Sequence, residues 1–523
     1  MSVLPTAGAT ATRGHQPGRQ RALGVLAVVA VLLLAGTAAD FFAAAEPALP
    51  PPPVEQGAAG AGSWYCPSVA GDGETGQLTI AAVGEQPSTV IVERYGQGRA
   101  DADEPRTVEP GAALTVGLED KDAAAPSAVR WTGGAAAVSW RVQGDRTASA
   151  PCEPAPAERW HVVGFDTNLG LTSTLHLFNP FTSDAVVRLV FATLEGGERL
   201  VLADNILVGA GSTRSLNMRR YKPEVADLGV TVEVLSGRVV AQGEQTIVPP
   251  PRTKGAAGRL LLSAAPVAAE NWYFGFAGDG NGAESWLSVL NPGDDVAAAE
   301  VRVSNPSGDA SSLLGEVSVP PGGVARVELA GASKDYGFGV AVNVVNGQPV
   351  VVSRSSSLRT DGRDGVSGGL GTPILSSTWA LVGGSTRSSA GLVNLYNPGP
   401  EPATATLTAP GAPQAWEAIQ LPPNCHASVE LLAAGEDRRT LPVLVRANVP
   451  IVAELRSFAT GGDELGLDLD VGVPQEVWLG PPSRPPVRRN SSLTTTVGRV
   501  APSEPDVFSD LEDLPAAPVE DAS

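Results

Sequence analysis

The amino-acid sequence predicts an all-β protein in which about four tandem immunoglobulin-like β-sandwich repeats follow one N-terminal transmembrane helix. Two observations support this fold class. The 523 residues include 60 Gly and 45 Pro, a composition that favours short strands joined by tight turns over long helices. A tryptophan also recurs at intervals close to the size of one small β domain. A β-propeller is the alternative arrangement for such repeats.

Five tryptophans mark the repeat. They lie 96, 112, 107 and 99 residues apart, at Trp64, Trp160, Trp272, Trp379 and Trp478. Three of them are followed, after 19, 19 and 18 residues, by an Asn-Pro pair, at Asn179, Asn291 and Asn397. Apolar and polar residues alternate before each Asn, as in a strand with one buried face. Because Pro cannot donate to a sheet ladder and Asn favours turns, the pair is expected to end that strand.

A turn sequence forms the second landmark of the repeat. Pro-Pro-Gly at residues 320–322 and Pro-Pro-Asn at residues 422–424 fit a type II turn, whose third residue needs a positive φ. Each unit then closes on two β-rich segments. Several short strands with regular turns in each repeat favour a sandwich.

These landmarks divide the chain into eight segments. Residues 1–21 are a basic cytoplasmic segment, residues 22–45 a transmembrane anchor or signal peptide, and residues 46–62 a linker rich in Pro, Ala and Gly. Four sandwich repeats follow, at residues 63–158, 159–270, 271–377 and 378–480, the last closing with a strand at Trp478. Residues 481–523 form a Pro-rich acidic tail that is expected to be disordered, because it cannot bury enough apolar surface.

The N-terminal segment predicts export. Residues 22–39 carry no charge, and eighteen helical residues span roughly 27 Å, close to the hydrocarbon thickness of a bilayer. Three Arg and no acid precede this run, which places the N-terminus in the cytoplasm and the bulk of the chain outside. The alternative is a signal peptide cleaved after the alanines at 43–45, which would give a secreted protein.

The composition limits which partners the protein can bind and which chemistry it can perform. A formal net charge of −20 argues against nucleic acid, which requires a concentrated basic surface. Three cysteines exclude a multi-cysteine zinc site. Cys66 and Cys152 flank the first repeat and are expected to form a disulfide outside the cytosol, which leaves Cys425 outside the pair.

No residue pattern indicates catalysis, a cofactor or a metal. The acids at 279–284 lack the spacing of a calcium loop and indicate a hairpin loop instead. Asp468 and Asp470 share one face of a strand and are interpreted as a solvated edge, together with the acids at 463–464. His176 is expected to face solvent, and Cys425 and His426 point to opposite strand faces, so they do not form a catalytic pair. The recurring Trp residues are interpreted as packing residues, with sugar stacking as the alternative.

The order of the motifs resembles a known family. The chain reads Trp-Tyr-Cys-Pro from Trp64, Trp-Tyr-Phe-Gly from Trp272, Ser-Trp-Leu-Ser-Val-Leu-Asn-Pro-Gly from Ser285, and Pro-Val-Val-Val-Ser-Arg-Ser from Pro349. With the N-terminal apolar run, this layout resembles the actinobacterial DUF5719 family over roughly Trp64 to Gly480. Many copies of the repeat have an acid soon after the first Trp, and here Phe165, Phe276 and Gly383 lie nearby. The family has no assigned function, so the resemblance implies no site residues.

The sequence thus predicts a non-enzymatic, membrane-anchored, extracytoplasmic structural or interaction protein of the bacterial cell envelope. Such a protein would be a rod of sandwich domains with one membrane span and an envelope protein or polysaccharide as partner. A carbohydrate-binding protein for wall glycan or envelope polysaccharide is the alternative, and an envelope enzyme is a weaker third hypothesis.

Overall fold

The structure is a computed structural model of the whole chain. It describes residues 60–478, apart from residues 68–69, 72, 97–98, 119–124, 145, 249–255, 279–282, 305–310, 330–336, 361–362, 383–388, 410–415, 432–441 and 460–466. All described residues belong to one compact unit, Ala59–Ser523. They form antiparallel sheets with very little helix, which confirms the predicted all-β class.

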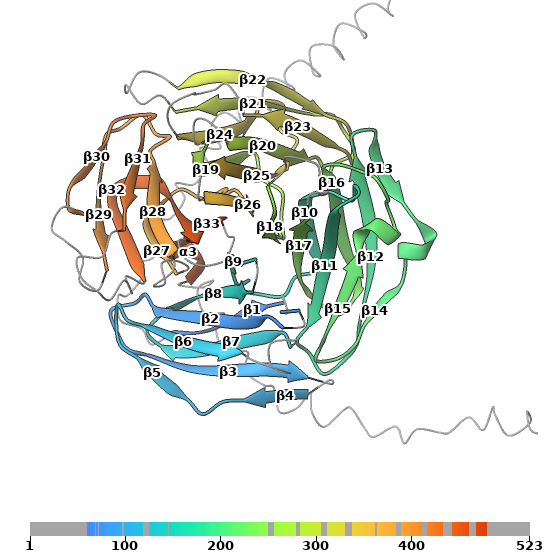
Figure 1. Cartoon of the computed structure of the whole chain (residues 1–523), viewed down its shortest axis with the longest axis horizontal. Helices are drawn as coiled ribbons and strands as arrows, with labels where there is room; N and C mark the ends of the chain where they lie inside the picture. Colours follow the sequence, from blue (N-terminus) through green and yellow to red (C-terminus); the bar gives the residue numbers. More distant parts are fainter. Residues whose placement is uncertain are drawn as a thin grey trace, which may run out of the picture. The chain divides into compact units, whose positions relative to one another are not determined.

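The first group of strands runs from β1 to β9 and forms two antiparallel sheets (Figure 1). One sheet has the order β1-β7-β3-β4, with β5 also paired to β3, and the other has the order β6-β2-β8-β9. The strands are β1 (Gly60–Cys66), β2 (Thr75–Ala82), β3 (Ser88–Gly96), β4 (Arg99–Ala102), β5 (Arg106–Val108), β6 (Ala113–Leu118), β7 (Ser127–Gly133), β8 (Ala136–Gln143) and β9 (Ala148–Pro151).

The second group repeats this order, as β10-β16-β12-β13 with β14 on β12, and as β15-β11-β17-β18. Its elements are β10 (Arg159–Phe165), β11 (Leu171–Asn179), β12 (Ala185–Thr193), β13 (Gly196–Arg199), the 3-10 helix η1 (Val201–Ala203), β14 (Ile206–Val208), β15 (Ser212–Asn217), the 3-10 helix η2 (Met218–Arg220), β16 (Leu228–Ser236), β17 (Val240–Ile247) and β18 (Gly258–Ser263).

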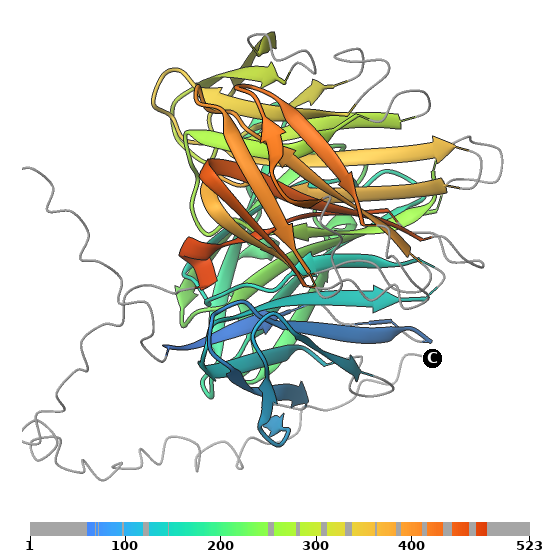
Figure 2. The same ribbon diagram turned by 90° about the vertical axis from the view of Figure 1, so that its left-hand side faces the viewer.

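The third group follows the same order again, as β19-β24-β21-β22 and β23-β20-β25-β26. Figure 2 shows its strands from the side. They are β19 (Asn271–Ala277), β20 (Ala283–Leu290), β21 (Ala297–Val303), β22 (Ser312–Val319), β23 (Val324–Glu328), β24 (Phe338–Val344), β25 (Val351–Thr360) and β26 (Arg363–Leu370).

The fourth group differs because one 17-residue strand, β32, pairs in both sheets. In the second and third groups the matching strands are separated by turns with a glycine at positive φ, Gly237 or Gly347. Residues 447–450 (Ala-Asn-Val-Pro) contain no glycine, and the chain stays extended. The elements are β27 (Ser376–Leu381), β28 (Ser389–Tyr396), β29 (Ala403–Thr408), β30 (Ile419–Leu421), β31 (His426–Glu430), β32 (Val443–Ala459), β33 (Leu467–Val471), β34 (Val473–Pro474) and α3 (Gln475–Trp478).

Alternating sequence explains the packing of each group. In β12, Ala185, Val187, Leu189 and Phe191 are buried and the residues between them are less so, which is the period of a strand with one core face. The buried side chains of the two sheets in a group meet in a common hydrophobic core. The expected turn geometry is also present, since Gly322 and Asn424 have φ values of 64° and 57°.

The four groups contact one another in a closed cycle. The last strand of each inner sheet packs against its neighbours, β9 against β18, β18 against β26, β26 against β33, and β33 against β9 (Figure 1). Small residues allow this approach; a Cβ added at Gly258 would lie 2.3 Å from the Val366 side chain. The first and fourth groups therefore meet, and the expected rod is wrong. Cyclic contact is a feature of propellers, but each group here has two sheets in place of one blade.

The ends of the chain lie outside this description. The expected anchor at residues 22–45, the linker up to residue 59 and the tail at 481–523 are not among the described residues. Within the described part of the chain, no helix has the length and apolar character needed to cross a bilayer.

Candidate functional site

The five repeat tryptophans are all buried, and four have equivalent partners. The indole N–H donates to a backbone carbonyl of the same strand group at 2.7–3.0 Å, in the pairs Trp64–Ala136, Trp160–Val239, Trp272–Val350 and Trp379–Ile451. Each of these four rings lies in the core of its own group. Their faces are not open for sugar stacking.

Trp478 differs from the other four. It lies in α3 and not in a strand, because Val473–Pro474 already occupies the edge of β27. Its ring packs in the same apolar cluster as Trp64 and Ala380. It therefore lies where the fourth group meets the first and does not belong to the fourth core alone.

The three repeat asparagines have one structural role. Each is fully buried, and its Nδ2 donates to the carbonyl four residues later at 2.7–2.8 Å. Each Oδ1 accepts from the backbone N–H two residues later at 3.0–3.1 Å. A further Nδ2 contact reaches the carbonyl of Val208, Val319 or Leu421. The side chains of Asn179, Asn291 and Asn397 thus hold the turn that follows each strand.

The cysteines and histidines also lie in structural settings. Cys66 and Cys152 form the expected disulfide, with their Cα atoms 4.8 Å apart, and Cys425 is buried elsewhere. His176 does not face solvent as expected. It is buried and contacts Ser215 Oγ at 2.9 Å and Glu244 Oε2 at 3.1 Å. Burial lowers the pKa of both His161 and His426 to about 4.

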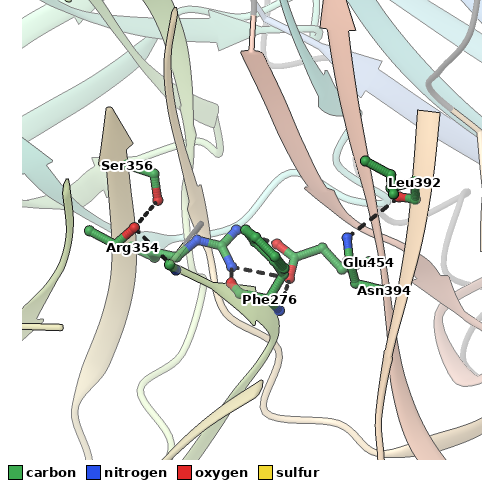
Figure 3. A network of polar contacts seen from close by, with 8 residues as sticks. Phe276, Arg354, Ser356, Leu392, Asn394 and Glu454 are labelled. Atoms are coloured by element: carbon green, nitrogen blue, oxygen red, sulfur yellow. Dashed lines mark hydrogen bonds and ion pairs between the residues drawn. The ribbon is translucent and has the colours of Figure 1, made fainter. Parts of the chain in front are cut away.

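Charged side chains are instead concentrated where the strand groups meet. Between the third and fourth groups, the Arg354 guanidinium forms a bidentate ion pair with the Glu454 carboxylate (Figure 3). Glu454 Oε2 also accepts from the Phe276 backbone N–H at 2.9 Å, and Arg354 donates to the Phe276 carbonyl. Both side chains are almost fully buried, at 1% and 0% exposure. Removal of either partner would leave an uncompensated buried charge, which is strongly destabilising.

A β-bulge in β19 makes the contact between Phe276 and Glu454 possible. The register of β19 shifts between Phe274 and Ala277, which frees the backbone of Phe276 from its ladder. The second group has the equivalent bulge, between Val163 and Phe165. There the Val163 carbonyl accepts from Ser353 Oγ of the third group at 2.8 Å. Ser353 and Glu454 occupy equivalent positions in the third and fourth groups. Each lies three residues after the residue whose backbone carbonyl accepts the hydrogen bond from the repeat tryptophan, Val350 or Ile451.

The junction of the second and third groups carries a second charged contact. Asp227 is buried and accepts from Ser288 Oγ at 2.7 Å and from Arg326 at 3.3 Å. The Arg326 guanidinium lies 4.2 Å above the ring of Trp286, which is half-buried. Burial would lower the pKa of Arg326, but the carboxylates of Glu328 and Asp227 raise it.

The first and second groups meet through Arg259 of β18. Its guanidinium contacts Glu74 of the first group at 2.5 Å and Glu244 of its own sheet at 2.9 Å. Burial opposes ionisation of Glu244, but the hydrogen bond from His176 and the charge of Arg259 lower its pKa. Apolar contact accompanies the ion pairs, since the Tyr95 and Phe178 rings meet edge to face at 4.9 Å.

The fourth group meets the first through Asp468 and Asp470 of β33. Asp468 Oδ1 accepts from the backbone N–H of Ser149 at 3.0 Å, and Asp470 Oδ2 accepts from Ser149 Oγ at 2.6 Å. Burial raises the pKa of Asp468 to about 6, opposed by Arg141. Burial and the charge of Asp468 raise the pKa of Asp470 to about 7. The two residues share a face as expected, but Asp468 is buried, so the solvated-edge interpretation is wrong for it.

The space beside this contact is small. A cavity of about 10 Å³ is lined by Ser139, Pro151, Leu455 and Asp470 among others, which is room for a single water molecule. No cluster of three or more His, Cys, Asp or Glu with metal-binding geometry occurs among the described residues. The calcium-like loop at 279–282 lies outside them.

Sequence reasoning missed these junctions, although one signal was present. Arg354 follows Val-Val-Ser in β25 and Glu454 follows Ile-Val-Ala in β32, and a charge in a buried part of a strand requires a buried partner. The sequence does not show which charge pairs with which, because the partners lie 100 residues apart in different groups.

The fold and its junctions define an all-β protein of tandem sheet pairs joined in a closed cycle. The model of DUF5719, a family of unknown function, matches residues 119–365. This match confirms the resemblance seen in the sequence motifs, and residues 119–365 are similar to that family. No curated protein matches the sequence.

Proposed function

We propose that the chain is a non-enzymatic protein of the bacterial cell envelope, held in the membrane by residues 22–45, whose four strand groups act as one docking platform. The observation that carries this proposal is the set of buried polar contacts at all four junctions. Such contacts restrict the groups to one relative arrangement. A surface that extends over several groups can then recognise a partner without the ordering entropy that flexibly linked domains would lose.

We further propose that each group is an immunoglobulin-like sandwich repeat. In the second group, β11 pairs with β15 and β12 pairs with β16, which matches the B–E and C–F pairs of that fold. The strands that correspond to the first and last strands of the immunoglobulin fold differ, since β10 lies beside β16 and β17 beside β11. Relative to the immunoglobulin fold, β10 lies in the sheet expected for the last strand, and β17 lies in the sheet expected for the first strand.

The proposal that the chain is not an enzyme rests on how its polar residues are used. The repeat asparagines, His176 and the junction carboxylates all have protein partners within hydrogen-bond distance. A catalytic acid or base would instead face a cavity large enough for a substrate.

Two experiments on the full-length chain test this proposal. A C-terminal tag on cells with a permeable outer layer should be removed by added protease; full protection of the tag would contradict the extracytoplasmic location. Affinity purification from solubilised membranes should retain a partner with wild type and lose it with E454Q, which disturbs one junction. Arg302→Gln, which removes an ion pair within one strand of the third group, is the matched control. Equal recovery of the partner with E454Q would contradict the single-platform model.

One observation favours the alternative of a carbohydrate-binding protein. Trp286 lies outside the repeating Trp positions and is half-buried beside Arg326 and Glu328. Partly exposed aromatic rings next to polar groups are common in ligand sites. Cell-wall polysaccharide should then retain wild type and release Trp286→Ala, while Phe181→Ala, at an exposed aromatic of the second group, should bind normally. Equal retention of both variants would exclude this site.

A further inference from the structure

The turn between β24 and β25 contains an Asn-Gly pair, the only one among the described residues. Asn346 is followed by Gly347, and both residues are exposed. Asn is among the chemically labile residues of proteins, because the backbone nitrogen of the next residue can attack its side-chain amide. Glycine permits this attack best, since it has no Cβ to obstruct the approach. A second pair, at residues 281–282, lies outside the described residues.

The Asn346 side chain is held in one orientation by β21. Its Nδ2 donates to the Val296 carbonyl at 2.8 Å, and its Oδ1 accepts from the Ala298 backbone N–H at 3.1 Å. Attack on Cγ would place negative charge on Oδ1. A fixed N–H group that already points at this oxygen stabilises the charge as it develops. The contact with Ala298 therefore favours the reaction as well as the turn.

Gly347 is free to supply the attacking nitrogen. Its φ is 75°, and no atom lies within 4 Å of the position that a Cβ would occupy. Its backbone N–H donates no hydrogen bond to another described residue. The nitrogen is therefore open to base in solution, and there is space for a new ring between the two residues.

The other groups provide internal comparisons. In the fourth group, Asn448 Oδ1 accepts from the Thr404 backbone N–H at 2.6 Å, which is the same kind of contact. The next residue is Val449, whose branched side chain crowds the backbone nitrogen, and the chain is extended there within β32. In the second group, Ser236 precedes Gly237, so the turn has no side-chain amide at that place. Of these three turns, only the one in the third group combines the amide with an open glycine.

We propose that Asn346 is a site of spontaneous deamidation. Base in solution removes the Gly347 N–H proton, and the nitrogen attacks Asn346 Cγ to form a five-membered succinimide. The bond between Cγ and Nδ2 breaks, and Nδ2 takes up a proton and leaves as ammonia. Water then opens the ring at either carbonyl, which gives aspartate or isoaspartate at position 346. Water is the only co-reactant.

The modification should release the turn from β21. Both products lack the Nδ2 donor to the Val296 carbonyl. Isoaspartate also adds one carbon atom to the backbone shortly before Val350, whose carbonyl accepts from the Trp272 indole. The Val345 backbone N–H, which donates to the Ala298 carbonyl at 2.8 Å, lies beside the modified residue and reports on the release.

Peptide mapping of the full-length chain tests the modification. The folded protein is incubated at neutral and at alkaline pH, digested, and treated with isoaspartyl methyltransferase and a labelled methyl donor. The peptide with Asn346 should take up label, and more of it at alkaline pH, whereas the peptide with Asn448 should take up none. N346Q should lose the label at position 346. An unlabelled Asn346 peptide from the folded chain would overturn the proposal, and label in a parallel sample in urea would then show that the turn protects the amide. Equal label at Asn448 would also overturn it.

Hydrogen exchange tests the release of the turn. N346D carries the aspartate product from the start, and its Val345 N–H should exchange about fivefold faster than in wild type, the effect of one lost hydrogen bond. N448D keeps the acceptor oxygen for the Thr404 N–H and is the matched control, in which exchange at Thr404 should not change. Unchanged exchange at Val345 in N346D would overturn the release of the turn.

Discussion

The Asp468 carboxylate accepts a hydrogen bond from the backbone N–H of Ser149, 3.0 Å away, although the two residues lie 319 positions apart in the chain. Asp468 belongs to β33 of the fourth group and Ser149 to β9, the last strand of the first. Asp470 accepts from the Ser149 hydroxyl in the same place. Since groups 1 and 2, 2 and 3, and 3 and 4 are also in contact, this junction turns a linear series into a cycle.

The same junction should give the protein a pH-dependent stability. A carboxyl group whose pKa is higher in the folded than in the unfolded state binds more protons when folded. The stabilisation is therefore present near pH 4 and is lost as pH rises through about 6 and about 7, the folded pKa values of Asp468 and Asp470. The variant D468N/D470N keeps the acceptor oxygens and does not titrate.

Urea denaturation of wild type and D468N/D470N at a series of pH values measures this effect. Relative to the variant, wild type should lose about 2–4 kcal/mol between pH 4 and pH 8. Arg141 faces the two carboxylates and reduces the effect. A difference between the two proteins that stays constant with pH would show that these carboxylates do not titrate as the burial implies.

Removal of one partner of the Arg354–Glu454 pair should strongly destabilise the protein, whereas replacement of both partners by apolar residues should destabilise it much less. E454Q leaves the buried guanidinium without a counter-charge and should destabilise the protein by about 3–5 kcal/mol. The double variant R354M/E454L removes both charges and should recover most of that loss. The half-exposed pair Arg302–Glu300 serves as control, where Arg302→Met should change stability by about 1 kcal/mol or less. Additive effects of the two single variants at 354 and 454 would contradict the coupling.

These contacts show where sequence reasoning succeeds and where it stops. Alternation before Asn291 and the positive φ demanded at Gly322 are local properties, so strands and turns were predictable from nearby residues. Buried partners of Arg354 and Asp468 come from other strand groups, and no local pattern specifies them. For the same reason the cyclic arrangement was missed.

Trp478 illustrates the same limit. The sequence predicts a strand at Trp478 that closes the fourth repeat, but the residue lies in α3 and packs in the cluster that contains Trp64. Trp478→Ala should lose about 3–5 kcal/mol, as large buried aromatics do. Hydrogen exchange should then increase in β1 as well as in β27. An increase confined to the fourth group would contradict its place at the junction.

The stability of the first group should depend on whether Cys66 and Cys152 are joined by the disulfide. Cys66 and Cys152 are 86 positions apart, and a loop of this size contributes about 4–5 kcal/mol in the chain-entropy model. Reduction should lower the midpoint of unfolding, and C66S/C152S should behave like the reduced wild type. Thiol titration of denatured, non-reduced protein should find one thiol per chain, at Cys425. Three thiols would show that the bond does not form.

A double-mutant cycle between Ser149 and Asp470 tests the closed arrangement most directly. Stability to urea is measured for wild type, Ser149→Ala, Asp470→Ala and the double variant. If β9 and β33 are in contact, the two substitutions should be non-additive by about 0.5–3 kcal/mol. The control pair of Ser149→Ala with Asp204→Ala, whose carboxylate pairs with Arg188 in the second group, should be additive within about 0.5 kcal/mol. Additivity of the Ser149 and Asp470 substitutions to the same precision would mean that the first and fourth groups do not meet, and that the chain is an open series.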